Sequence, residues 1–103
     1  MAKEPLKVLT ESMFYVLLSL MHSERCGTEI VQYVSDTTAD RVPLGPGTLY
    51  TILAKFEEEG LIEEIAVEGR KRTYAITERG KGMFRRELNR LRQCVADGER
   101  EGE

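Results

Sequence analysis

The sequence predicts a mainly α-helical fold with one small β-hairpin, and three observations lead to that prediction. Apolar residues recur at three- and four-residue spacings in three stretches of residues 1–60, the period of helices with a buried side. After Gly60 the period changes to two on both sides of a short polar turn, as in a hairpin. A heptad-like spacing then returns near the C-terminus and predicts a longer last helix.

The first predicted helix follows a short arm, residues 1–9. Thr10 is a candidate N-cap, and Glu11 lies in the first turn, where the helix dipole favours an anion. Apolar side chains then occupy most of the circumference, so we expect burial on more than one side, within the fold or against a partner. These side chains are Met13, Phe14, Val16, Leu17, Leu18, Leu20 and Met21.

Two further helices are predicted before Gly60. The second runs from about Gly27 to Thr37, after a loop at residues 23–27 and before another at residues 36–40. In the third, Pro46 suits the first helical position and Gly60 suits a left-handed C-cap. Its apolar face holds Leu49, Ile52, Leu53 and Phe56, and its opposite face holds Thr48, Tyr50, Thr51 and Lys55.

The hairpin and the last helix complete the pattern. Residues 61–67 and 71–76 flank a turn at residues 68–70. Thr77 is a candidate N-cap for a helix from about Glu78 to Asp97. This helix carries a seam spaced 4, 3 and 4, which favours pairing with a second copy over packing on its own domain, because the core is complete without it. The seam consists of Phe84, Leu88, Leu91 and Val95.

The composition is that of one ordinary globular domain. Of its 103 residues, 41% are hydrophobic and 32% charged, a balance that separates it from disordered chains. No stretch approaches the ~18 consecutive apolar residues of a membrane span, and residues 1–12 lack the apolar segment of a secretory signal. We therefore expect a cytoplasmic protein without a membrane partner. The formal net charge of −3 by itself argues against a nucleic-acid partner.

The residues that carry chemistry do not form a catalytic or metal-binding set. His22 is the only histidine, and Cys26 and Cys94 are isolated from each other, so we expect reduced thiols and no His–Cys pair. The three glutamates at residues 57–59 are consecutive on a helix, so their side chains point about 100° apart and do not converge on one cation; we expect them to be solvated. Residues 45–47 lack the spacing of a phosphate-binding loop. We expect no enzyme, no cofactor and no metal.

Three helices followed by a hairpin is the element order of a winged helix-turn-helix, in which the third helix enters the DNA major groove and the hairpin, or wing, contacts the backbone or minor groove. Residues 69–92 hold nine basic and two acidic residues, a net charge of +7, so the remainder carries −10. Basic residues at the turn suit phosphates, although the alternative is that they only solvate the hairpin. The predicted DNA-contacting residues are Thr48, Tyr50, Thr51, Lys55, Arg70, Lys71 and Arg72.

Three segments carry a family resemblance: LTESMFYVLLSL at residues 9–20, GTLYTILAKFEEEGLI at residues 47–62 and GRKRTYAITERG at residues 69–80. Together they resemble the PadR-type transcriptional regulators. Residues 9–20 are similar to the first helix of that family, and residues 47–62 resemble its recognition helix and exit. Residues 69–80 are similar to its wing and the start of its last helix, except that Thr73 stands where the family commonly has Tyr. The resemblance covers roughly residues 9–95.

The resemblance implies a homodimeric repressor on a palindromic operator, of the short subfamily with a single C-terminal dimerisation helix. We therefore expect a winged-helix DNA-binding domain at residues 1–80, a dimerisation helix at 81–97 and a flexible acidic tail at 98–103. The expected interface residues are Phe14, Phe84, Leu88, Leu91 and Val95.

The resemblance also implies release by a small effector. Some short members hold flat aromatic molecules at the dimer interface, often against a tryptophan; this chain has no Trp, so that pocket chemistry does not carry over. The alternative function is a winged-helix protein–protein interaction module that does not bind DNA.

Overall fold

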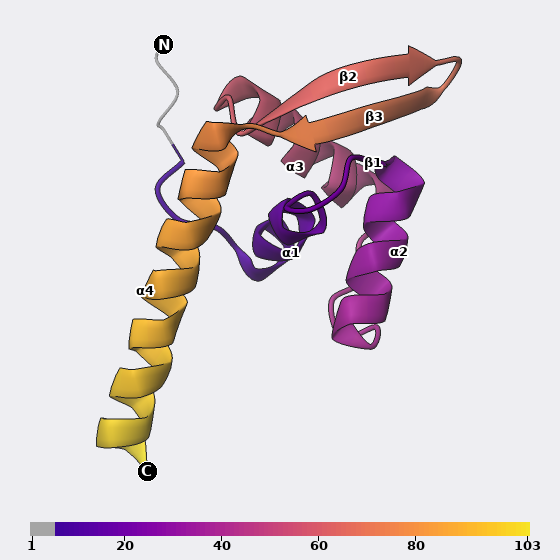
Figure 1. Cartoon of the computed structure of the whole chain (residues 1–103). Coiled ribbons are helices and arrows are strands. Elements are labelled where there is room, and N and C mark those ends of the chain that lie inside the picture. Colours follow the sequence, from indigo (N-terminus) through magenta and orange to yellow (C-terminus); the bar gives the residue numbers. More distant parts are fainter. Residues whose placement is uncertain (1–5) are drawn as a thin grey trace.

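The computed structural model describes residues 6–103, and the first five residues of the predicted arm lie outside that range. Within it, four helices surround a core beside a three-stranded antiparallel sheet (Figure 1). The prediction of a mainly helical fold with a small hairpin is therefore confirmed. The elements are α1 (Glu11–Ser19), β1 (Arg25–Cys26), α2 (Gly27–Thr38), α3 (Pro46–Glu58), β2 (Ile62–Glu68), β3 (Lys71–Ile76) and α4 (Glu78–Gly102).

Helix α1 lies at the centre, between α2 and α4 (Figure 1). The Thr10 hydroxyl accepts a hydrogen bond from the Met13 amide at 3.2 Å, which confirms the predicted N-cap. Val16 and Leu17 are fully buried, and α1 contacts α2, α3 and α4, so the expected burial on several sides is also confirmed. The side chains that complete the core from α2 and α3 include Ile30, Val34, Leu53 and Phe56.

The sheet contains one strand more than the hairpin that the sequence predicts. Arg25 and Cys26, expected in a loop, pair with Tyr74 and Thr73 of β3, so the strand order is β1-β3-β2. Two residues are too few to show a period of two. Arg25 is held in place from both sides, because its Nε donates to the Ser19 carbonyl at 2.6 Å and its guanidinium lies 4.5 Å from the Tyr33 ring centroid.

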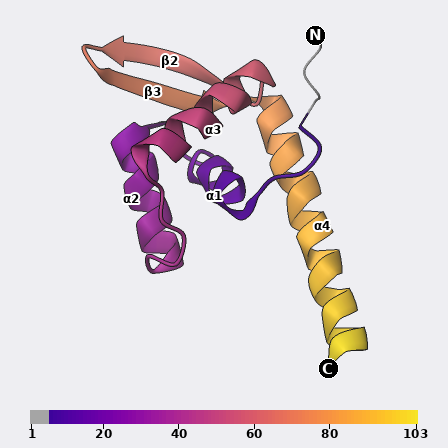
Figure 2. The ribbon, with the colours of Figure 1, turned by 180° about the vertical axis from the view of Figure 1, so that it is seen from behind.

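Strands β2 and β3 form the predicted hairpin, which projects beyond α2 and α3 (Figures 1 and 2). Gly69 adopts a φ of +61° in the turn between them, a conformation that glycine adopts without a steric cost. A register shift between Glu64 and Ala66 marks a β-bulge, so the outer strand twists locally. We refer to this hairpin as the wing.

Helix α4 is longer than the sequence predicts. It continues through Gly102, where a flexible tail was expected from residue 98. Side chains of neighbouring turns link this last part: Arg100 forms an ion pair with Asp97 at 3.0 Å, and Gln93 donates to Asp97 at 2.9 Å. Contacts between residues three or four apart support helix locally and offset part of the low helix propensity of Gly98.

Two carboxylates hold the end of the N-terminal arm. Glu59, at the end of α3, accepts a hydrogen bond from the Leu6 amide at 2.6 Å, so it is not merely part of a solvated face. Glu87 of α4 accepts from the Leu9 amide and is only 1% exposed. Its other contacts come from Arg90, which donates from Nε at 2.8 Å and from Nη2 at 3.1 Å. The hydrogen bonds from Arg90 hold the pKa of Glu87 below its usual value, against the effect of burial.

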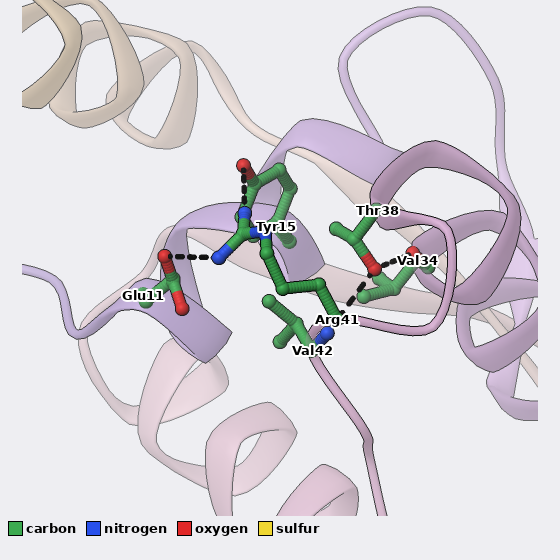
Figure 3. Close-up of polar contacts among 6 residues, drawn as sticks. All are labelled: Glu11, Tyr15, Val34, Thr38, Arg41 and Val42. Carbon is green, nitrogen blue, oxygen red and sulfur yellow. Dashed lines mark hydrogen bonds and ion pairs between the residues drawn. The ribbon is translucent and has the colours of Figure 1, made fainter.

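The turn after α2 is tied to α1, which fixes where the chain enters α3. Arg41 donates to the Glu11 carboxylate at 2.9 Å and to the Tyr15 hydroxyl at 3.0 Å (Figure 3). On the other side of the turn, the Thr38 hydroxyl donates to the Val34 carbonyl at 2.7 Å and accepts from the Val42 amide at 3.3 Å.

Candidate nucleic-acid interface

Helix α3 presents one buried and one solvent-facing side. Its apolar residues Leu49, Ile52, Leu53 and Phe56 are buried, as the spacing predicts. The opposite side carries the residues that the sequence singles out for DNA. Thr48 and Thr51 are exposed, the Tyr50 side chain is 56% exposed, and Lys55 is half-buried. We call this set, Thr48, Tyr50, Thr51 and Lys55, the recognition face.

The wing carries its positive charge at and just after the turn. Arg70 lies in the turn, and Lys71 and Arg72 begin β3; all three are exposed. We call these three residues the basic wing cluster. Arg72 also contacts the neighbouring strand, because its Nη1 lies 3.4 Å from an oxygen of Glu64. Outer strand β2 is acidic, so the two strands of the wing differ in charge.

A groove of about 410 Å³ brings part of the recognition face to the basic wing cluster. Tyr50 lines it from α3 and the three cations line it from the wing, whereas Thr48, Thr51 and Lys55 lie outside it. The groove therefore joins the two predicted sets through a single aromatic side chain. Its lining consists of Cys26, Gly27, Thr28, Glu29, Tyr50, Arg70, Lys71, Arg72 and Tyr74.

The N-terminus of α2 is the part of this groove that the sequence analysis missed. Its first residues, Cys26 to Glu29, line the same groove as the wing cations, and a helix N-terminus carries partial positive charge. The Glu29 carboxylate accepts from the Cys26 amide at 2.8 Å, and this hydrogen bond, with smaller effects of Lys71 and Arg25, lowers the pKa of Glu29. A Glu three residues after a cap position is a recognised N-terminus signal, but only the fold brings it next to the wing.

A second hollow of about 380 Å³, more apolar, lies between α2 and the start of α3. Tyr50 lines both hollows, together with Gly27 and Thr28. The apolar contribution comes from Val31, Leu44, Pro46 and Leu49.

The first half of the predicted seam on α4 packs against the rest of the chain, and its second half is exposed to solvent. Phe84 is 7% exposed and stacks on Phe14 of α1, with ring centroids 5.0 Å apart, so these two residues pack within the chain itself. Leu88 is half-buried against the core, whereas Leu91 is 37% and Val95 59% exposed. The exposed half borders a shallow hollow of about 340 Å³ lined by Leu88, Leu91, Arg92, Val95, Ala96 and Glu99.

In the described part of the chain, no three side chains of His, Cys, Asp or Glu are grouped so that they could hold a metal ion. No helix among residues 6–103 is both long enough and apolar enough to cross a membrane. Both cysteines are free thiols, Cys26 buried and Cys94 exposed.

Three packed helices, a hairpin beside the third, and an extra C-terminal helix define a winged helix-turn-helix protein. Comparison with known families agrees: residues 16–86 match the transcriptional regulator PadR-like family. The chain belongs to this family, which is one of transcriptional regulators and not of enzymes. Comparison with curated protein sequences gives no match.

Solved structures similar to this chain share its fold. A transcriptional regulator from Clostridium thermocellum is 20% identical, with a TM-score of 0.80 over 93% of this chain and 100% of that one. A PadR family transcription regulator from Clostridium difficile is 18% identical, with a TM-score of 0.76 over 88% and 97%. Bacillus subtilis PadR in complex with operator DNA is 24% identical, with a TM-score of 0.65 over 74% of this chain and 46% of that one.

Proposed function

We propose that the protein is a homodimeric repressor that binds a palindromic DNA operator and is released by a small-molecule effector. The observation that carries the DNA-binding part is the groove in which Tyr50 of the recognition face meets the basic wing cluster. A surface that combines an exposed helix face with neighbouring cations suits a major groove and its flanking phosphates. The winged-helix part, residues 1–80, supplies this surface.

In the proposed complex the two parts of the surface have different tasks. Thr48, Tyr50 and Thr51 face base edges or nearby phosphates, whereas the basic wing cluster contacts the backbone beside them. The wing supplies affinity because each neutralised phosphate releases condensed counterions. Since the rest of the chain is acidic, non-specific affinity is modest, and tight binding requires two wings that act together.

The proposed dimer forms through α4. Its second half extends away from the other elements in both views (Figures 1 and 2), and at about 1.5 Å per residue its 25 residues span about 37 Å. Exposed Leu91 and Val95 with half-buried Leu88 would be covered by a second copy along residues 81–97. Phe14 and Phe84 support this surface from inside the chain. Two α3 helices would then lie about one DNA turn apart, roughly 34 Å.

Release by an effector is the third part of the proposal. A small hollow of about 170 Å³ lies between α1 and α4 and includes the rings of Phe14 and Tyr15 and the side chain of Leu91. A small effector held there and across to a partner would change the angle between the two copies, and with it the spacing of the α3 helices.

A gel-shift experiment tests the proposal against a protein–protein interaction module that does not bind DNA. Purified protein is titrated into a duplex that contains a palindrome from upstream of its own operon, and into a random duplex of the same length. We expect a stronger shift with the upstream duplex, and a clear weakening of both shifts when Arg70, Lys71 and Arg72 are changed together to Ala. The proposal fails if neither duplex shifts, or if the triple variant binds like the original protein.

A further inference from the structure

One cation of the basic wing cluster already has an anionic partner. In the register of β2 and β3, Glu64 lies opposite Tyr74, two positions along β3 from Arg72. Side chains two apart on a strand point to the same face, so Arg72 and Tyr74 share a face, and both line the groove. Glu64 reaches that face from the outer strand and forms the 3.4 Å ion pair with Arg72.

A second observation places the charge of Glu64 beside the groove. Tyr74 is 3% exposed, and burial is the main reason why its pKa is raised. The charges of Glu57 on α3 and Glu64 on β2 raise the pKa of Tyr74 further. Glu57 and Glu64 therefore lie close enough to act on Tyr74, a groove residue, although a DNA-binding surface is expected to be positive.

We propose that Glu64 competes with DNA phosphate for Arg72 and so limits the affinity of the wing for DNA. This inference rests on the proposed DNA-binding function. When the wing meets the backbone, the Arg72 guanidinium exchanges one carboxylate for a phosphate, and the Glu64 carboxylate returns to solvent. Nothing covalent changes; the exchange alters only which anion neutralises Arg72.

The geometry of the pair makes such an exchange feasible. The contact is single and at 3.4 Å, not the shorter, two-point arrangement in which Arg binds carboxylates most strongly. The side chains are 60% and 25% exposed, so water screens the pair. Exposed pairs of this kind contribute little, and their loss corresponds to a change of about 1.4- to five-fold in an equilibrium constant. Glu64 thus weakens each wing contact by about that factor without abolishing it.

Glu63 offers a matched control on the same strand. It is exposed, lies opposite Ala75, and forms no ion pair within the described residues. Replacing either glutamate by Gln removes one negative charge from β2. Only the change at Glu64 releases Arg72.

The experiment uses the full chain and a fluorescently labelled random duplex of about 30 base pairs, three helical turns, so that the operator need not be known. Affinity is measured by anisotropy at about 0.1 M salt, where the Debye length is about 10 Å. We expect Glu64→Gln to bind about 1.4- to five-fold more tightly per wing, and Glu63→Gln to increase affinity by a clearly smaller factor. Circular dichroism melting checks that both variants are folded.

A double-mutant cycle isolates the pair. We expect Arg72→Gln to weaken binding, and Glu64→Gln in that background to have no larger effect than Glu63→Gln. Equal effects of the two glutamate variants in the original background would overturn the inference, and weaker binding by Glu64→Gln would overturn it as well, since Glu64 would then position Arg72. If the original protein binds neither this duplex nor the upstream one, the proposed function itself fails. Those outcomes are therefore distinguishable.

Discussion

Replacing Gly80 by Ala tests how α4 is joined to the wing. Gly80 is buried in the first turn of α4, and a Cβ there would lie 2.1 Å from the Leu61 carbonyl oxygen and 2.7 Å from a side-chain carbon of Ile76. Ordinary contacts between carbon and carbonyl oxygen begin at about 3.3 Å, so one of the two must move by more than about 1 Å. Leu61 cannot yield easily, because its carbonyl accepts the Thr77 amide at 3.0 Å.

The expected loss of stability follows from these contacts. Forcing an extra carbon into packed structure costs about 1–3 kcal/mol, and displacement of the turn weakens the cap in which the Thr77 hydroxyl accepts the Gly80 amide at 3.0 Å, worth about 1 kcal/mol. The better helix propensity of Ala offsets at most about 1 kcal/mol of this. We expect Gly80→Ala to lower the free energy of unfolding by about 1–3 kcal/mol.

Gly82 provides the matched control two residues later in the same helix. It is exposed, and a Cβ there would meet nothing within 4 Å. Gly82→Ala should therefore raise stability by up to about 1 kcal/mol through helix propensity alone. Both variants are unfolded with urea and by heat at one protein concentration, followed by far-UV circular dichroism. A difference of about 3 kcal/mol corresponds to more than about 10 °C in Tm for a domain of this size. If Gly80→Ala is as stable as Gly82→Ala, the reasoning about this junction is wrong.

Three further predictions follow from the same structure. The pKa of Glu87 is lower in the folded protein than its unfolded value near 4.3. The ionised carboxylate therefore stabilises the fold at pH values above the unfolded pKa, and this stabilisation is lost as the pH falls through the folded pKa. Glu87→Gln should reduce the dependence of Tm on pH in the acid range. Leu91→Asp should sediment as a monomer. Asn89→Asp, which adds the same charge at another exposed residue of α4, should sediment as a dimer. If both variants sediment alike, Leu91 does not lie in the dimer interface. If about 6–10 phosphates are contacted per dimer, affinity for DNA should fall roughly 10³-fold or more between about 50 and 200 mM salt, and the triple Ala variant of the basic wing cluster should show a clearly shallower slope; a salt-insensitive complex would contradict the wing contacts.

The features predicted most closely from sequence depend on neighbouring residues. Helix α3 begins at Pro46, and Gly60 after its end has a φ of +72°, because ring closure in proline and the absence of a Cβ in glycine act within one or two residues. The period of two around the turn at Gly69 predicted the hairpin for the same reason. The exposure of Tyr50 followed from the spacing of the apolar face of α3.

The features that the sequence did not predict depend on partners far along the chain. Strand β1 exists because Arg25 and Cys26 lie beside β3, about 48 positions later, and Glu87 is buried because it meets the Leu9 amide, 78 positions away. The same holds for the candidate site: the basic wing cluster is evident in the sequence, but its closeness to the α2 N-terminus and the pairing of Arg72 with Glu64 are not. Local stereochemistry and hydrophobic spacing thus determined the four helices, the hairpin and the exposed face of α3. Only the tertiary structure decided which polar group meets which, since that depends on how the elements pack.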